Sequence, residues 1–331
     1  MVINFEHRTA AHCETGVTSN MLHFYGYELS EAMIFGIGEG YTFTYIPFVP
    51  FKGNAIKFSF RSVPGLIFTK ALKKLGVKVG IKRFSNKEKA MNELDQLLAA
   101  GIPVGNVVGL FHLPYSPVRT HFNSHNLCVV GKEGNDYIIS DPCWHDTLLK
   151  ISYDDLVKVR FAQGMFKPRG KMYWMKEKPV LADVRPIIAK SIEKACNNMI
   201  GSPMPFLGTR GIALLAKKMR TIEKKMGAGD AIQYLASLVQ VIEEVGTGGG
   251  GYRYMYGVFL HEAAEMLNDP KLKSYSVEMS KIGDMWRDLA LESGRKFKNR
   301  SDASYDDLAD KLVKIAAAEK EFFVTLKKYV K

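Results

Sequence analysis

The sequence has little of what marks membrane-spanning, secreted or disulfide-rich proteins. Apolar runs in its 331 residues are short and are interrupted by glycine, proline or charged residues, so we expect no membrane-spanning segment. The first residues lack the basic stretch and apolar core of a secretory signal. Four cysteines are too few for a disulfide framework in a chain of this length. These absences predict a cytoplasmic protein whose cysteines are reduced.

The chain also lacks any long run of basic residues. It carries 46 Lys and Arg against 34 Asp and Glu, a formal net charge of +12, but the excess is spread along the sequence without interleaved aromatic motifs. We therefore expect no nucleic-acid partner. A dispersed basic surface can keep a protein soluble, or it can steer an acidic partner or a phosphate-bearing substrate.

Up to residue 178, helical spacing and strand-like alternation are mixed, which predicts an α+β domain with a mostly antiparallel sheet. A helix is expected from Cys13 to Tyr25, because apolar residues recur three and four positions apart and Gly26 can end it. Further helices are expected at 30–35, 64–75, 86–100 and 154–157, and strands at 41–48, 55–60, 77–84, 103–111, 125–132, 137–140, 146–152 and 170–176.

From residue 179 onward the helical spacing is almost uninterrupted, and Pro179 and Pro186 mark the change. We therefore expect an α+β domain over residues 1–178 and an all-helical domain over residues 179–331. The expected helices are 183–199, 207–226, 229–245, 251–267, 271–294 and 304–329.

A nucleophile, a base and a carboxylate occur in an order that suits thiol catalysis. Cys13 lies at the start of the first helix, where the helix dipole lowers the pKa of a thiol. His125 begins an apolar strand, and Asp141 ends the next strand, just before Pro142. A thiolate attacks an acyl carbon, an imidazole shuttles the proton, and a carboxylate fixes the imidazole tautomer. The alternatives are a buried apolar cysteine and an ordinary Asp-Pro turn.

Two further histidines are candidates for the cleft. His121 lies four residues before His125, but in an expected loop. Because a catalytic base needs rigid placement, His125 is favoured as the base, and His121 is left to line the cleft or the surface. His12 directly precedes Cys13 and is the second cleft candidate.

No metal or nucleotide cofactor is expected. Cys143 and His145 could join Cys13 and His125 in a zinc site, but Cys-x-His is a poor spacing for tetrahedral ligation. The glycines at 36–40 follow a helix signal instead of a strand, so they do not form a dinucleotide-binding loop.

A glycine-rich block at 246–251 leads into a helix that carries Arg253. Free backbone N–H groups at a helix start, here at Gly248, Gly249 and Gly250, can bind an anion together with a guanidinium. The alternative is a closely packed turn between helices, which also selects glycine.

Several stretches resemble one known family. HCETGVTSNMLHFYGYELSEAMIFGIGEG, followed by HNLCVVG and YIISDP, resembles the N-terminal domain of the butirosin biosynthesis protein H family. GTGGGGYRYMYGVFLHEAAE resembles the helical domain of unknown function that often follows it. The resemblance implies a papain-like cysteine-protease fold, followed by an all-helical domain, and an acyltransferase with Cys13, His125 and Asp141 as its triad.

The resemblance also implies partners. The donor would be an acidic acyl carrier protein whose phosphopantetheine arm bears the acyl thioester, and the glycine block could hold the phosphate of that arm. The acceptor would be a small-molecule amine. Papain-like enzymes commonly carry glutamine six residues before the cysteine. His7 stands there in this chain, which makes it a candidate oxyanion donor alongside the backbone N–H of Cys13.

Three functions are compatible with these features. The first is an acyltransferase, the second is a cysteine peptidase or amidase that uses water as acceptor, and the third is a non-catalytic binding protein on the same fold. An intact set of catalytic residue types argues against the third. Transfer differs from hydrolysis in the exclusion of water. A helical domain large enough to cover the cleft, and a basic balance that suits an acidic carrier, favour transfer.

Overall fold

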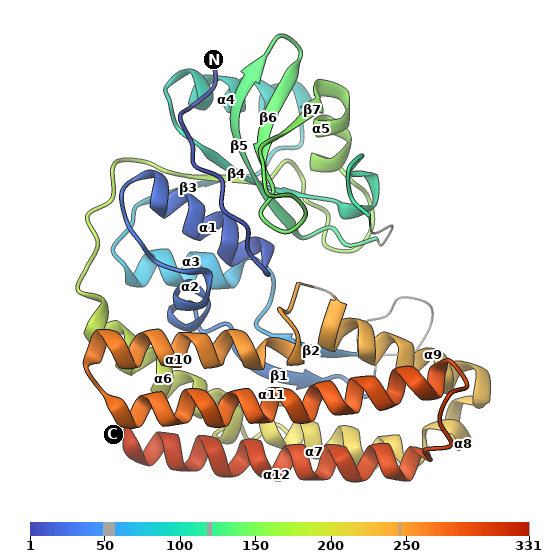
Figure 1. The fold of residues 1–331 in the computed structure, drawn as a ribbon. Coiled ribbons are helices and arrows are strands. Elements are labelled where there is room, and N and C mark those ends of the chain that lie inside the picture. The colour runs from blue at the N-terminus through green and yellow to red at the C-terminus, as the bar shows by residue number, and fades with distance from the viewer. Residues whose placement is uncertain (49–56, 118–120, 245, 331) are drawn as a thin grey trace. The chain divides into compact units, whose positions relative to one another are not determined.

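The computed structural model describes residues 1–48, 57–117, 121–244 and 246–330, which divide into two compact units (Figure 1). The first unit contains Met1–Ile34 and Pro64–Ala182, and the second contains Phe35–Val63 and Asp183–Lys331. The expected division of the chain into 1–178 and 179–331 is therefore corrected, because residues 35–63 belong to the unit that also contains the C-terminal helices.

A six-stranded sheet forms the centre of the first unit, and every neighbouring pair in it is antiparallel. Its strand order is β3-β8-β4-β5-β6-β7. The strands are β3 (Val79–Lys82), β4 (Val104–Val108), β5 (His125–Glu133), β6 (Asp136–Ser140), β7 (Leu149–Ser152) and β8 (Met172–Met175). All five residues of β4 are buried, so this strand is covered on both faces of the sheet.

Helices surround this sheet. They are α1 (Cys13–Phe24), α3 (Leu66–Lys74), α4 (Lys87–Ala99) and α5 (Tyr153–Arg160), with a short 3₁₀ turn at Leu110–His112. Helix α1 contacts β5, α4 contacts β4 and β5, and α5 contacts β4, β6 and β7. Helix α2 (Glu31–Ile37) crosses from the residues of the first unit to those of the second.

The β5–β6 hairpin positions the candidate site. Its strands are joined through Gly134, which has a φ of +60° that glycine adopts without strain. Cys128 pairs with Ser140 in the ladder. Because the two strands are antiparallel, His125 at the start of β5 lies beside Asp141, which follows β6.

The described residues of the second unit form helices and one pair of strands. The helices are α6 (Val184–Ile200), α7 (Gly208–Met219), α8 (Ile222–Met226), α9 (Ala228–Val239), a π-helical turn (Gln240–Glu244), a 3₁₀ turn (Gly250–Tyr252), α10 (Arg253–Leu267), α11 (Pro270–Phe297) and α12 (Tyr305–Tyr329). The strands are β1 (Tyr41–Tyr45) and β2 (Phe58–Arg61), so residues 55 and 56 of the expected strand lie outside the described residues.

Backbone contacts attach β1 to the helical region. The Tyr45 N–H donates to the carbonyl of Phe206 at 2.8 Å, and Thr44 forms a bridge with Leu207. Gly36 lies so close to α10 that an added Cβ would be 2.2 Å from the ring of Phe259. These contacts join segments far apart in sequence, which local periodicity does not report.

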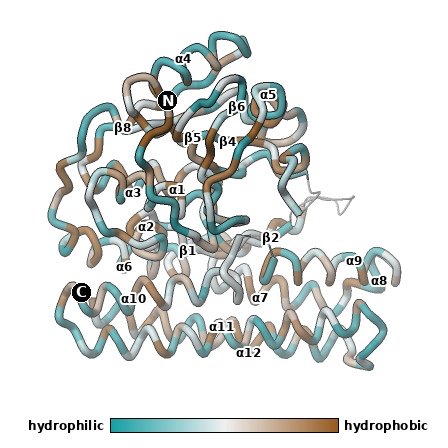
Figure 2. The backbone as a smooth tube through the Cα atoms, turned by 45° about the horizontal axis from the view of Figure 1, so that its top comes forward, coloured by the Kyte–Doolittle hydropathy of each residue, from teal (hydrophilic) through white to brown (hydrophobic). Residues whose placement is uncertain are grey.

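Figure 2 shows apolar residues concentrated along β4 and β5, and apolar and polar residues alternating along α11 and α12. The α+β class is confirmed, as is the expected order of a helix that begins at Cys13, an antiparallel sheet and then a helical C-terminal region. Within the described ranges, no helix is both long and apolar enough to cross a bilayer.

Candidate active site

Helix α1 begins at Cys13, and the segment before it is fixed by two kinds of contact. The Glu31 carboxylate accepts hydrogen bonds from the backbone N–H groups of Ala11 (2.8 Å) and His12 (3.0 Å). Gly16 allows close packing, because an added Cβ would lie 2.4 Å from the Cβ of Ala10. The start of α1 therefore has a defined position, which a nucleophile requires.

His125 and Asp141 form a buried pair. The imidazole Nε2 lies 2.7 Å from the Asp141 Oδ2, and the two side chains are 4% and 0% exposed. The Tyr115 hydroxyl donates to the same carboxylate oxygen at 2.9 Å, and the Cys143 backbone N–H donates to the other at 3.2 Å. The imidazole, the Tyr115 hydroxyl and the Cys143 backbone N–H thus fix the position of the carboxylate.

Cys13 interacts with the His125 ring, whose Nδ1 remains available because Nε2 faces Asp141. A hydrogen bond from the Cys143 thiol, followed by the charge and hydrogen bonding of His125, holds the pKa of Cys13 well below its usual range despite burial. Burial lowers the pKa of His125, but Asp141 and Cys13 outweigh it and raise that pKa to about 10. The geometry therefore favours a thiolate beside an imidazolium.

Cys143 is a member of the site that sequence reasoning considered only as a metal ligand. Its hydrogen bond to Cys13 and its burial raise the pKa of its own thiol well above the usual range, so it stays protonated as a donor. Its position shortly after Asp141 was the available signal. Among the described residues, no group of three or more His, Cys, Asp or Glu side chains could hold a metal ion.

Asn126 is the second residue that sequence reasoning missed. Its Nδ2 lies 3.9 Å from the Cys13 Sγ and also donates to the Ser124 carbonyl at 3.1 Å. Its Oδ1 accepts from the Tyr173 hydroxyl at 3.1 Å, which fixes the orientation of the amide. A buried donor beside the sulfur can stabilise an oxyanion. A buried asparagine directly after His125, in an otherwise apolar strand, was the available signal.

The structure corrects the role expected for His7. Its Nδ1 lies 2.8 Å from the Ser140 hydroxyl, and its Nε2 lies 2.9 Å from the His145 carbonyl. Because a carbonyl only accepts, Nε2 carries the proton that it donates there. Both ring nitrogens therefore tie the N-terminal segment to β6 and the loop after it, and neither is left to act as an oxyanion donor.

The two cleft histidines differ in position. His12 is buried, its Nδ1 lies 3.0 Å from the Thr15 hydroxyl, and its charge is the smallest of the contributions that lower the pKa of Cys13. His121 is exposed and stacks on the Phe111 ring, with 4.0 Å between centroids. The structure thus brings His125, and not His121, to Cys13.

The expected anion site at the glycine block is also corrected. Gly248, Gly249 and Gly250 have φ values of 65°, 85° and 58°, which explains the need for glycine. The Gly250 N–H already donates to a carboxylate oxygen of Glu243 at 3.1 Å, and the Gly249 N–H donates to the Thr247 hydroxyl at 3.0 Å. Bound anions would compete with these acceptors.

The guanidinium of Arg253 is fully buried within the second unit. It donates to the Glu319 Oε1 from Nε (2.9 Å) and Nη2 (2.7 Å), and to the Gly251 carbonyl from Nη1 (2.6 Å). The rings of Tyr41 and Trp286 lie 4.9 Å from its central carbon. Its charge is neutralised inside the unit, so the alternative of a packed turn is favoured over an anion site.

Comparison with known proteins finds two family models and similar solved structures. Residues 12–142 match the model described as butirosin biosynthesis protein H, N-terminal, and residues 154–326 match a domain of unknown function, DUF4872. No curated protein gives a significant match. A C39-like peptidase from Bacillus anthracis aligns with 15% identity and a TM-score of 0.38, over 53% of this chain and 97% of that one.

Proposed function

This chain belongs to the butirosin biosynthesis protein H-like family, with a DUF4872 domain after the N-terminal domain, and we propose that it is a cysteine-dependent acyltransferase. In this proposal Cys13 takes an acyl group from a thioester and passes it to an amine. The observation that carries the proposal is the buried array in which His125 lies 2.7 Å from Asp141 and Asn126 Nδ2 lies 3.9 Å from the Cys13 Sγ. Cys143 and His125 lower the pKa of Cys13 in this array.

The first half of the reaction forms acyl-Cys13. The thiolate attacks the thioester carbonyl, and the oxyanion receives hydrogen bonds from the Cys13 backbone N–H, which is free at the first turn of α1, and from the Asn126 Nδ2. The C–S bond to the leaving thiol then breaks. The His125 imidazolium donates its proton to that thiol, so Cys13 carries the acyl group and His125 becomes neutral.

The second half consumes the acyl-enzyme. Neutral His125 accepts a proton from the attacking amine, the tetrahedral intermediate collapses to an amide, and the Cys13 thiolate leaves. The His125 imidazolium formed in this step restores the starting ion pair. Asp141 keeps the ring oriented throughout, because its carboxylate is itself held by Tyr115 and by the Cys143 backbone.

A cavity on the Cys143 side supports an amine as the acceptor. It has a volume of about 650 Å³, and Glu31 and Asp146 are the carboxylates among the described residues that line it. Cys143 also lines this cavity and lowers the pKa of Cys13, so a molecule bound there approaches the acyl group. Carboxylates attract a protonated amine, which loses one proton to solvent before its neutral form attacks, whereas a water acceptor gains nothing from an acidic lining.

Intact-mass spectrometry tests the proposal. We expect the purified chain to gain the mass of one acyl group on incubation with an acyl-carrier or acyl-pantetheine thioester, and to lose it faster when a primary amine is added. Cys13→Ala should not gain the mass, whereas the matched Cys196→Ala variant should. Acylation followed by loss at a rate that amines do not change would identify a hydrolase. Absence of an adduct with every thioester would indicate a binding protein.

A further inference from the structure

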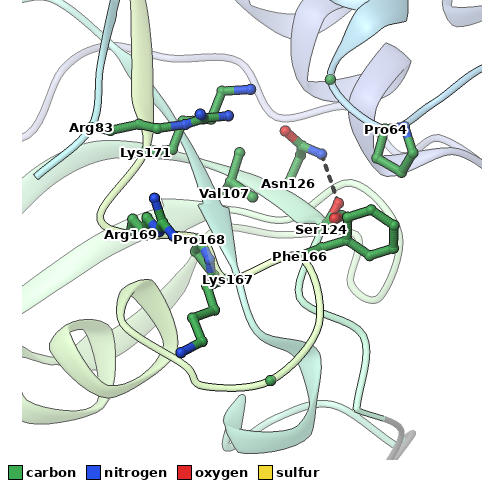
Figure 3. Close-up of a pocket in the computed structure, with 12 residues that line it drawn as sticks. Pro64, Arg83, Val107, Ser124, Asn126, Phe166, Lys167, Pro168, Arg169 and Lys171 are labelled. Carbon is green, nitrogen blue, oxygen red and sulfur yellow. Dashed lines mark hydrogen bonds between the residues drawn. The ribbon is translucent and has the colours of Figure 1, made fainter.

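A second cavity, of about 390 Å³, lies in the first unit and is strongly basic (Figure 3). Of the 12 described residues that line it, four are positively charged and none is negatively charged. Figure 3 shows Arg83 and Lys171 above Val107, and Lys167 and Arg169 below it. A cavity with one sign of charge concentrates ligands of the opposite sign.

One side chain that lines this basic pocket also lies beside the Cys13 sulfur. Asn126 lines the pocket, and its Nδ2 is 3.9 Å from the Cys13 Sγ. Ser124, which directly precedes His125, lines the pocket as well and accepts a hydrogen bond from Asn126 (Figure 3). A group bound beside Asn126 therefore lies near a carbonyl that Cys13 attacks.

Within the described residues, the four basic side chains of the pocket lack ion-pair partners, although the Glu14 carboxylate acts on Lys171. Among the residues that the structure describes, no ion pair involves any of the four basic side chains. Lys171 is confined, because its ammonium lies 5.2 Å from the centre of the Phe68 ring and an added Cβ at Gly65 would be 2.9 Å away. Burial and the nearby Arg83 lower the pKa of Lys171, and Glu14 opposes them. A bound anion would relieve this repulsion.

The loop that carries two of the basic residues is held in an unfavourable conformation. Phe166 and Arg169 have φ values of +55° and +53°, which non-glycine residues rarely adopt. The buried Asn123 side chain donates to the carbonyls of Gln163 (3.0 Å) and Met165 (2.9 Å), which fixes the loop. Such strain is characteristic of binding sites that are formed before the ligand arrives.

We infer that this pocket binds a carboxylate carried by the acyl group of the donor, so that the enzyme prefers acidic acyl thioesters. The inference rests on the proposed function and names its substrate class. The phosphate of the phosphopantetheine arm is the other anionic group of the donor that this pocket could bind. An extended pantetheine arm, however, separates that phosphate from the thioester carbonyl by roughly 20 Å. Proximity to Cys13 therefore favours a carboxylate on the acyl group. The opposite charge of the two cavities then separates an acidic acyl group from a basic acceptor.

The test compares acylation rates of Cys13, measured by intact mass, for glutaryl-pantetheine and pentanoyl-pantetheine, which differ in the terminal carboxylate. We expect the glutaryl donor to react about tenfold faster with the unchanged protein, because a partly buried charge contact exceeds a surface ion pair in strength. In Lys171→Met and in Arg83→Gln the ratio should fall toward one, while Lys87→Gln, an exposed change on α4, should keep it. Arg83 is exposed, so its variant remains informative if the partly buried Lys171→Met misfolds.

Equal rates for the two donors, or a preference that Lys171→Met and Arg83→Gln leave intact, would overturn the inference. A third donor, pentanoyl-4′-phosphopantetheine, identifies the other anion source. If it alone is preferred, and the preference depends on Lys171, the pocket binds the phosphate of the arm and the carboxylate proposal is wrong.

Failure of the proposed function gives a different result. In that case no thioester acylates Cys13, and the pocket is tested by alkylation of Cys13 with anionic iodoacetate and neutral iodoacetamide. A rate ratio that shifts toward iodoacetamide in Lys171→Met supports a pocket for carboxylates, and a ratio that is unchanged by the substitution contradicts it.

Discussion

Each unit buries an ionic cluster, and the two clusters differ in what surrounds the charge. In the second unit, one oxygen of Glu319 accepts from the Arg253 guanidinium and from the Trp286 indole N–H at 2.7 Å, and aromatic rings cover the remaining guanidinium surface. In the first unit, the partners of Cys13 are an imidazole and a thiol, both of which can gain or lose protons. Asn126 and Cys143, beside the sulfur, also line cavities.

The comparison shows that burial of a charge does not by itself indicate a reactive site. Arginine does not change its protonation state in proteins, and a fully buried, hydrogen-bonded pair offers no exposed atom to a substrate. A thiolate beside an imidazolium changes state during a reaction and can be reached through an adjacent cavity. The Arg253 cluster therefore stabilises its unit, and the Cys13 cluster is the one suited to chemistry.

The largest expected effect is on the stability of the second unit, and it would sharpen the contrast between the two clusters. Arg253→Met should lower the free energy of unfolding of the second unit by about 3–5 kcal/mol, because it leaves the Glu319 carboxylate buried without its cation. Urea unfolding followed by Trp286 fluorescence measures this, with Trp144 and Trp174 replaced by Phe in both proteins. Arg253→Met combined with Glu319→Gln should recover part of the loss. Under native conditions, Arg253→Met should not change the rate at which iodoacetamide alkylates Cys13.

The next largest effect concerns the protonation states of Cys13 and His125 in the first unit. Since the pKa of Cys13 is lowered and that of His125 is raised to about 10, the thiolate–imidazolium pair should persist from acidic pH up to about pH 10. The rate of Cys13 alkylation should therefore rise at acidic pH and then stay level. In His125→Ala the rate at pH 6 should fall about 100-fold, because without the imidazolium the Cys143 hydrogen bond is left to oppose the burial that raises the pKa of Cys13, and the thiol is then mostly protonated. His121→Ala is the control. A wild-type profile that rises only above pH 8 would contradict the ion pair.

Local signals predicted where the candidate site residues lie, because the geometry that places them is local or follows from one hairpin. Helix spacing placed Cys13 at a helix start, and antiparallel pairing brought His125 to Asp141. The contacts of Cys143 and Asn126 with the Cys13 sulfur depend on how the chain continues after Pro142 and on the approach of α1 to β5. Neither the course of the chain after Pro142 nor the approach of α1 to β5 produces a periodic pattern in the sequence.

The errors have related causes. His7 was assigned by its spacing from Cys13, but its nitrogens contact Ser140 and His145, which are distant in sequence. Residues 35–63 were assigned to the first domain because they carry strand patterns. Their strands instead pair with each other and with the segment before α7, in the unit whose other residues are helical. Sequence patterns report the type of an element better than its tertiary partner.

The smallest expected effect tests the contribution of the Cys143 thiol to the pKa of Cys13. In Cys143→Ala the hydrogen bond from this thiol is lost, so the pKa of Cys13 should rise, while His125 still holds it below the ordinary range. We expect alkylation of Cys13 at acidic pH to slow by roughly threefold to tenfold, since a hydrogen bond to a charged group contributes about 1.5–3 kcal/mol and a thiol is a weak donor. The plateau rate near pH 8 should be unchanged. Cys143→Ser, which keeps a donor, should recover most of the rate, and Cys196→Ala should behave as the unchanged protein. A loss as large as that of His125→Ala would mean that Cys143, and not the imidazolium, is the principal partner of the thiolate.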